Sequence, residues 1–165
     1  LAGPVSDDGL WRAKEPPDPI ALWRLEAFRA WATRAGVYSE ERVAAADAWE
    51  PETVLPILQA WMRQPQPPTA VFCANDAIAI AVFEAACELG IELPTELSVV
   101  GIDDVAQAST VHPSLTTIPV PVEEIGRESV RALLRRMAGR PVEECRTKVP
   151  LPGLILRESV TRPKF

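Results

Sequence analysis

The chain has 165 residues, of which 47% are apolar, and a formal net charge of −6 at pH 7. This length and composition indicate about one folded domain with a hydrophobic core and exclude a disordered chain. No apolar run approaches the roughly 18 residues of a membrane-spanning helix, so we expect no membrane partner. An acidic chain without a basic stripe is not suited to binding nucleic-acid phosphates by itself.

The amino-terminal part of the chain contains two predicted helices. An Asp-Pro pair at 18–19 is typical of a helix start, and apolar residues then recur at helical spacing, which predicts a helix over 19–35. A short strand is predicted over 42–49. Proline at its first position then begins a second helix, predicted over 51–63.

The middle of the chain alternates strands and helices. Compact apolar runs at 69–74 and 97–102 predict two buried strands. Residues 76–89, between them, predict a helix that ends at Gly90, because glycine readily takes the left-handed conformation that closes helices. Residues 104–109 are compatible with one or two helical turns.

The carboxyl-terminal part begins with an extended segment at 114–118 and continues into an amphipathic helix predicted over 122–139. A last short strand is predicted over 153–156. Continuous apolar strands that alternate with helices are typical of βαβ units. The sequence therefore predicts the α/β class, with a parallel sheet flanked by helices on both faces.

Two polar pairs follow the predicted strands, Asn75-Asp76 and Asp103-Asp104. In parallel sheets, ligands bind beyond the carboxyl ends of the strands, so we expect these pairs to converge on one site. We interpret Asp76 as a helix cap that bonds the backbone N–H groups of the first turn. Asn75 and Asp103 remain, and an amide beside a carboxylate suits the vicinal hydroxyls of a sugar.

A stacking face is predicted at the same edge, and catalysis has little support. Trp49 lies at a strand-to-helix joint, where its ring would project beside the polar pairs. The single histidine, His112, precedes a proline and has no nucleophile signature beside it. We predict no catalytic residue; an enzyme of another class would use Asp103 with His112 as acid and base.

The cysteine pattern indicates neither a metal site nor a disulfide framework. Cys73, Cys87 and Cys145 are odd in number and lack the paired spacing of metal ligands. Cys73 and Cys87 lie in apolar runs, where buried thiols are common. We expect a cytoplasmic protein with no metal ion and no cofactor.

Four motifs and a closing segment together resemble the effector-binding domain of the lactose/galactose-repressor (LacI/GalR) family of transcriptional regulators. The resemblance covers residues 20–159. The motifs are "PTAVFCAND" (68–76), "ELPTELSVVGIDD" (92–104), "HPSLTTI" (112–118) and "IGRESVRALL" (125–134), and the closing segment is "LPGLILRES" (151–159).

The resemblance implies a type I periplasmic-binding-protein-like fold, in which two α/β subdomains close on a small ligand. Residues 4–114 and 141–165 would form mainly the carboxyl-terminal subdomain, and 115–140 the segment that normally returns to the amino-terminal one. Most of that subdomain and the DNA-binding headpiece would be absent. The apolar face of the helix over 122–139 would then pack elsewhere or exchange with another molecule.

The resemblance also implies the site residues and partners. Asn75 and Asp103 match positions that contact the effector, and Trp49 matches an aromatic position that stacks on it. The position of a ligand-contacting arginine, two residues before Arg24, holds Leu22. We expect a small effector, a sugar, and contact with operator DNA only through a headpiece; the alternative is a transport-type sugar-binding protein of the same fold.

The helix over 76–89 carries apolar residues nearly all round, so one face needs a partner beyond the sheet. The family dimerises through this region, and we predict a homodimer contact at Ile80 and Phe83. Sedimentation should show a dimer; a monomer at high protein concentration would contradict this contact.

Overall fold

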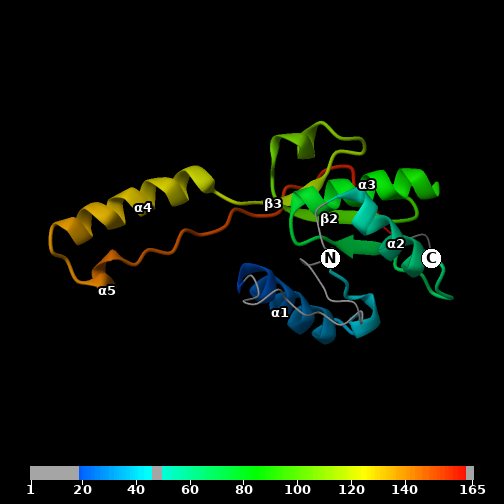
Figure 1. Cartoon of the computed structure of the whole chain (residues 1–165), viewed down its shortest axis with the longest axis horizontal. Coiled ribbons are helices and arrows are strands. Elements are labelled where there is room, and N and C mark those ends of the chain that lie inside the picture. Colours follow the sequence, from blue (N-terminus) through cyan, green and yellow to red (C-terminus); the bar gives the residue numbers. More distant parts are fainter. Residues whose placement is uncertain (1–18, 46–49, 163–165) are drawn as a thin grey trace.

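The computed structural model describes residues 19–45 and 50–162, and these residues confirm the predicted α/β class. Three parallel strands form a sheet in the order β1-β2-β3 (Figure 1). The strands are β1 (Ala70–Phe72), β2 (Ser98–Asp103) and β3 (Thr116–Pro119). Each lies within or next to a segment for which the sequence predicts extended backbone.

The predicted helices are confirmed, with ends that shift by one or two residues at most. The helices are α1 (Pro19–Arg34), α2 (Pro51–Met62), α3 (Asp76–Leu89), α4 (Val122–Met137) and α5 (Val142–Cys145), and two short 3-10 helices are η1 (Glu40–Arg42) and η2 (Ala106–Ser109). Gly90 closes α3 with a φ of 70°, as its sequence position predicts. The helix α5 was not predicted, because its four residues are too few to show a periodicity.

The strand predicted over 42–49 is wrong for its described part. Residue 42 ends the 3-10 helix η1, and residues 43–45 have no regular secondary structure. The N–H of Val43 donates to the carbonyl of Glu40 at 3.0 Å and closes the 3-10 helix, and Val43 has extended backbone but does not pair with a neighbouring strand. Residues 46–49 lie outside the described residues.

The strand predicted over 153–156 is reduced to a single antiparallel bridge between Ile155 and Thr117. The N–H of Ile155 donates to the carbonyl of Thr117 at 2.9 Å, and the reverse bond is 3.2 Å long. This bridge joins the segment that returns from α5 to the outer edge of β3.

The hydrophobic core lies between α2, α3 and the sheet. Small side chains on α3, such as Ala79 and Ala85, are fully buried and allow close approach of its neighbours. The largest fully buried apolar side chains are Leu58, Ile78, Leu97 and Leu115. Helix α1 lies on the β1 side of the sheet (Figure 1). There the rings of Phe28 and Phe72 stack with centroids 5.6 Å apart.

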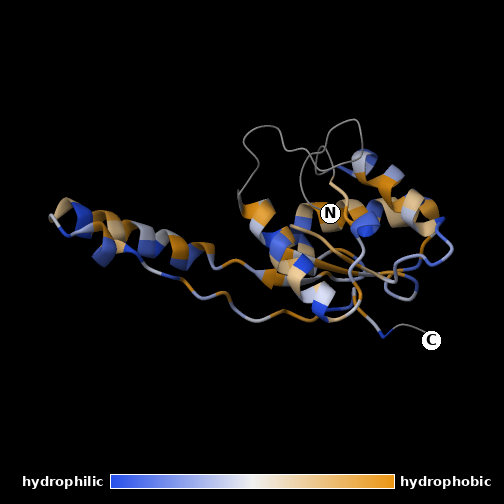
Figure 2. Cartoon of the chain, turned by 90° about the horizontal axis from the view of Figure 1, so that it is seen from below, coloured by the Kyte–Doolittle hydropathy of each residue, from blue (hydrophilic) through white to orange (hydrophobic). Residues whose placement is uncertain are grey.

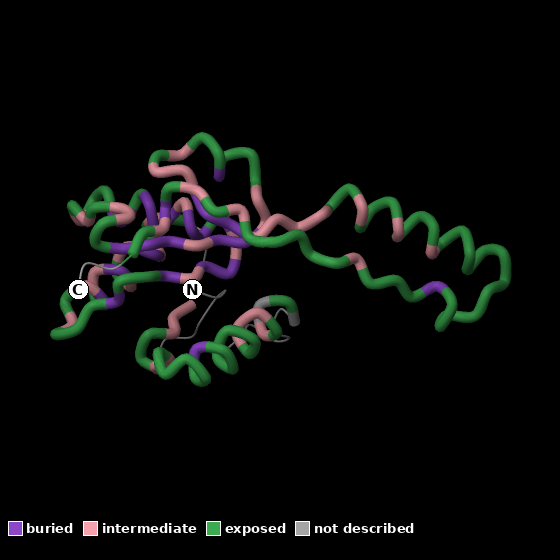
Figure 3. Tube along the Cα trace, turned by 180° about the vertical axis from the view of Figure 1, so that it is seen from behind, coloured by how far each residue is buried: buried purple, intermediate pink, exposed green. Residues whose placement is uncertain are grey.

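Helix α4 projects away from the sheet (Figures 1 and 2), and the side chains of its apolar face are exposed. The exposed side chains are Val122, Ile125, Val130, Leu133, Leu134 and Met137, with accessible fractions between 40% and 75%. The segment that returns beneath α4 is also largely exposed (Figure 3). Within the described residues, no helix is both long and apolar enough to cross a membrane.

The cysteine environments predict unequal reactivity, because thiolates are the reactive species. Burial raises the pKa of Cys73 to about 11, whereas Cys87 is exposed. At pH 8, iodoacetamide should therefore label Cys87 rapidly and Cys73 only after unfolding, as measured by peptide mass spectrometry. The Cys87→Ser variant should remove the rapid phase, and rapid labelling of Cys73 in the folded protein would contradict its burial.

Candidate functional site

The carboxyl ends of β1 and β2 bring Asn75 and Asp103 to the same edge of the sheet. Phe72 pairs with Val100 in the parallel register, and the N–H of Cys73 continues the ladder by donating to the carbonyl of Val100 at 2.8 Å. Asn75 follows the end of β1 by three residues, and Asp103 ends β2 three residues beyond Val100. Both residues therefore lie beyond or at the carboxyl ends of neighbouring parallel strands, as expected.

The cap of α3 is Asn75, and the interpretation of Asp76 as the cap is wrong. Asn75 has extended backbone, and its Oδ1 accepts a hydrogen bond from the N–H of Ile78 at 2.8 Å. Asp76 is the first helical residue, and its side chain is fully buried. Because capping occupies the amide oxygen of Asn75, a ligand contact by this residue falls mainly to its NH2 group, a donor.

Asp103 ends β2 in a conformation that non-glycine residues rarely adopt. Its φ is 122°, and that of Asp104 is 56°. Such backbone conformations persist only where surrounding contacts impose them, and they occur often at functional sites. Asp103 keeps about a third of its side chain exposed, so its carboxylate is accessible at the sheet edge.

Arg24 of α1 reaches both strand ends and was missed by the sequence interpretation. Its Nη2 lies 3.4 Å from Oδ1 of Asp103, and its Nη1 donates to the carbonyl of Ala74. The family resemblance aligns the ligand-contacting arginine with position 22, and this position is a leucine in this chain. The sequence signal was only that Arg24 lies four residues before Phe28 on the same helix face; that Phe28 stacks on β1 is seen only in the fold.

The two aspartates at the end of β2 have different electrostatic partners. Burial raises the pKa of Asp103; the charge of Arg24 opposes that rise, and the charge of Asp76 adds to it. Asp104 forms an ion pair with Arg157, with 2.7 Å between Oδ1 and Nη2, and both side chains are largely covered. Asp104 therefore anchors the carboxyl-terminal segment, and Asp103 is the carboxylate that can meet a ligand.

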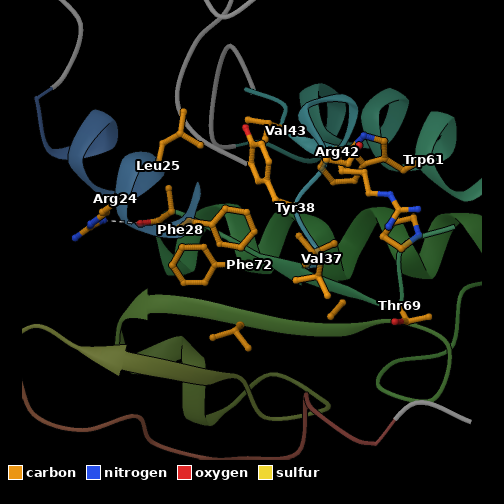
Figure 4. A pocket seen from close by; sticks show the side chains of 16 residues that line it. Arg24, Leu25, Phe28, Val37, Tyr38, Arg42, Val43, Trp61, Thr69 and Phe72 are labelled. Atoms are coloured by element: carbon orange, nitrogen blue, oxygen red, sulfur yellow. Dashed lines mark hydrogen bonds between the residues drawn. The ribbon is translucent and has the colours of Figure 1, made fainter. Parts of the chain in front are cut away.

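A cavity of about 480 Å³ runs along β1, between that strand, α1 and the segment that follows α1 (Figure 4). It begins at Arg24 and Ala74, beside the polar edge, and extends to Arg42 and Thr69. The wall between these ends is mainly apolar and includes Phe28, Val37, Val43, Trp61, Val71 and Phe72. Such a wall does not suit a polyol, so the polar candidate site is the edge itself.

Of the other sequence-predicted residues, the structure describes His112, Ile80 and Phe83. Trp49 lies outside the described residues. His112 is exposed in its loop, and Phe83 is only 8% exposed because it packs into the core, while Ile80 is partly buried. Among the residues that the structure describes, no group of three or more His, Cys, Asp or Glu side chains is placed to hold a metal ion.

The ion pair at the site predicts a measurable pKa change. Because Arg24 stabilises the charged form of Asp103, Arg24→Gln should raise the Asp103 pKa further above its usual range, as followed by carbon NMR of the carboxyl group. Arg29→Gln is the matched control, since Arg29 on the same helix pairs with Glu40 instead. An Asp103 pKa that falls or stays constant in Arg24→Gln would contradict the pairing.

Comparison with known proteins identifies the family. Residues 10–160 match the periplasmic binding protein-like domain. The chain is 38% identical over 137 residues to the HTH-type transcriptional repressor PurR of Erwinia tasmaniensis, covering 83% of this chain and 40% of that protein. It is 36% identical over 147 residues to the ribose operon repressor of Haemophilus influenzae, covering 86% of this chain and 42% of that protein.

Solved structures agree with the sequence relatives. A LacI family transcriptional regulator from Mycobacterium smegmatis superposes with a TM-score of 0.72 at 30% identity, over 87% of this chain and 54% of that chain. The transcriptional regulator CelR in its cellobiose complex superposes with a TM-score of 0.72 at 27% identity, over 96% of this chain and 45% of that chain.

The chain thus spans about two fifths of the length of these two curated relatives. Both are transcriptional repressors and not enzymes. The family match covers most of the chain, and the parallel sheet with its helices agrees with the superposed regulator. The chain belongs to the periplasmic-binding-protein-like effector domains of LacI-family transcriptional repressors.

Proposed function

We propose that this chain binds a small sugar at the carboxyl edge of its sheet and thereby regulates a transcriptional repressor. The observation that supports this proposal is the convergence of Arg24, Asp103 and Asn75 at the ends of β1 and β2. Relatives support the ligand class, since one is named a ribose operon repressor and another was solved with cellobiose.

The proposed chemistry is hydrogen bonding to vicinal hydroxyl groups. The carboxylate of Asp103 accepts from two hydroxyls, and the guanidinium of Arg24 and the NH2 of Asn75 donate to hydroxyl oxygens. Arg24 lies only 3.4 Å from Asp103, so the two side chains hold each other in place before a ligand arrives. A pre-arranged polar edge lowers the entropy lost on binding.

The proposed regulation is a population shift in the cytoplasm. A sugar that binds one arrangement of the effector domain more tightly stabilises that arrangement, and with it one affinity for operator DNA. DNA binding would belong to a headpiece outside this chain, and a homodimer would present two headpieces. We also propose that the exposed apolar face of α4 packs against the remaining part of the effector domain.

A thermal-shift screen tests the ligand class. D-ribose, cellobiose and a panel of nucleobases should be compared, and we expect a saturable rise in melting temperature with a sugar, because ligand binds only the folded chain. For that sugar, Asp103→Asn should weaken affinity by about tenfold to a hundredfold, since hydrogen bonds to charged groups are worth roughly 1.5–3 kcal/mol.

Glu84→Gln is the matched control, because it removes one carboxylate from the exposed side of α3. Titration calorimetry on the three proteins should show a loss for Asp103→Asn alone. Because the pKa of Asp103 is raised, its carboxylate becomes protonated at a higher pH than an ordinary aspartate as the solution is acidified. Sugar binding by the wild-type chain should therefore weaken as the pH falls, and this weakening should begin at a higher pH than for an aspartate with an ordinary pKa. Unchanged affinity in Asp103→Asn would remove this carboxylate from the site.

A further inference from the structure

The fully buried carboxylate of Asp76 has partners on two elements other than its own helix. Its Oδ1 accepts from the hydroxyl of Thr117 on β3 at 2.6 Å. Its Oδ2 accepts from the backbone N–H of Val105, which follows β2, at 3.0 Å. Helix capping explains neither bond, because Asn75 caps the helix.

The sheet is shaped to admit this carboxylate. A Cβ atom added to Gly101 of β2 would lie 2.1 Å from Oδ1 of Asp76, far inside contact distance. It would also lie 3.2 Å from the side chain of Leu115. Glycine at this position therefore lets the Asp76 carboxylate lie directly against the backbone of β2.

The bond to Val105 holds one end of the strained turn that carries the ligand carboxylate. Asp103 and Asp104, both with positive φ, immediately precede Val105. At the other side, the carbonyl of Asp103 accepts from the N–H of Val120 at 3.3 Å. A positive φ at a non-glycine residue persists only when surrounding contacts impose it. The bond from Val105 to Asp76 is one contact that can impose it on Asp103 and Asp104.

We propose that Asp76 is a positioning residue, whose contact with Val105 holds the Asp103 turn in its effector-binding conformation. This inference rests on the proposed function of Asp103. The two bonds of the carboxylate have separate roles: the Thr117 bond stabilises the core, and the Val105 bond sets the turn. If the Asp76 carboxylate only stabilised the fold, a variant that lacks it and still folds would keep the wild-type conformation of the Asp103 turn.

The test uses the full chain and needs no ligand. Asp76→Ala removes both bonds, and Thr117→Val removes the core bond alone. NMR reports amide exchange of Val105 and the three-bond HN–Hα coupling of Asp103, which depends on φ. In Asp76→Ala, we expect Val105 exchange to accelerate about tenfold or more and the coupling to move toward extended values.

Thr117→Val should lower the melting temperature but leave the Asp103 coupling and the local exchange of Val105 as in the wild type. Asp76→Asn should restore both signals, because its amide oxygen still accepts from Val105 and its NH2 can donate to Thr117. An unchanged turn in folded Asp76→Ala would overturn the proposal. If Asp76→Ala does not fold, Thr117→Val decides the question, because it keeps the bond from Asp76 to Val105. Loss of the turn in Thr117→Val would then overturn the proposal.

Binding of D-ribose or cellobiose separates this proposal from the proposed function. Where the wild type binds one of them, Asp76→Ala should weaken affinity about tenfold and Asp76→Asn should recover it, and equal affinity in all three would overturn the positioning role. A turn that depends on Asp76, in a wild type that binds neither sugar, would support positioning of the Asp103 turn and count against the sugar proposal alone.

Discussion

The buried carboxylate of Asp76 is the constraint on which the arrangement of the site depends. A carboxyl group removed from water needs hydrogen-bond partners, because an unpaired buried polar or charged group is strongly destabilising. Thr117 and Val105 supply those bonds from two different segments, and Gly101 supplies the space. One side chain at the start of α3 therefore ties that helix to β3 and to the turn after β2.

The same contacts explain the electrostatics of the sheet edge. Asp103 stands near the buried charge of Asp76 and is itself partly desolvated, so its carboxylate is less readily ionised than usual. Arg24 compensates from α1, and Arg157 separately neutralises Asp104. The four acidic and basic groups of Asp103, Asp104, Arg24 and Arg157 thus form two pairs, of which only the first meets the accessible edge.

The edge is also connected to the projecting part of the chain. Val120, between β3 and α4, donates to the carbonyl of Asp103, and Arg157 lies on the segment that returns from α5. Both connections between the sheet and the exposed α4 therefore contact the aspartate pair after β2. These two bonds link the aspartate pair to both segments that lead to and from the α4 region.

The sequence by itself determined the α/β class, the long helices and the sheet edge at which polar residues gather, because hydrophobic periodicity and capping residues are local signals. It did not determine which member of Asn75-Asp76 caps α3, since both residue types cap helices and only packing shows that Asp76 is buried. It also missed Arg24, whose contact with Asp103 joins residues that are 79 positions apart. Tertiary structure decided these points, because a buried charge is tolerable only where distant segments supply its partners.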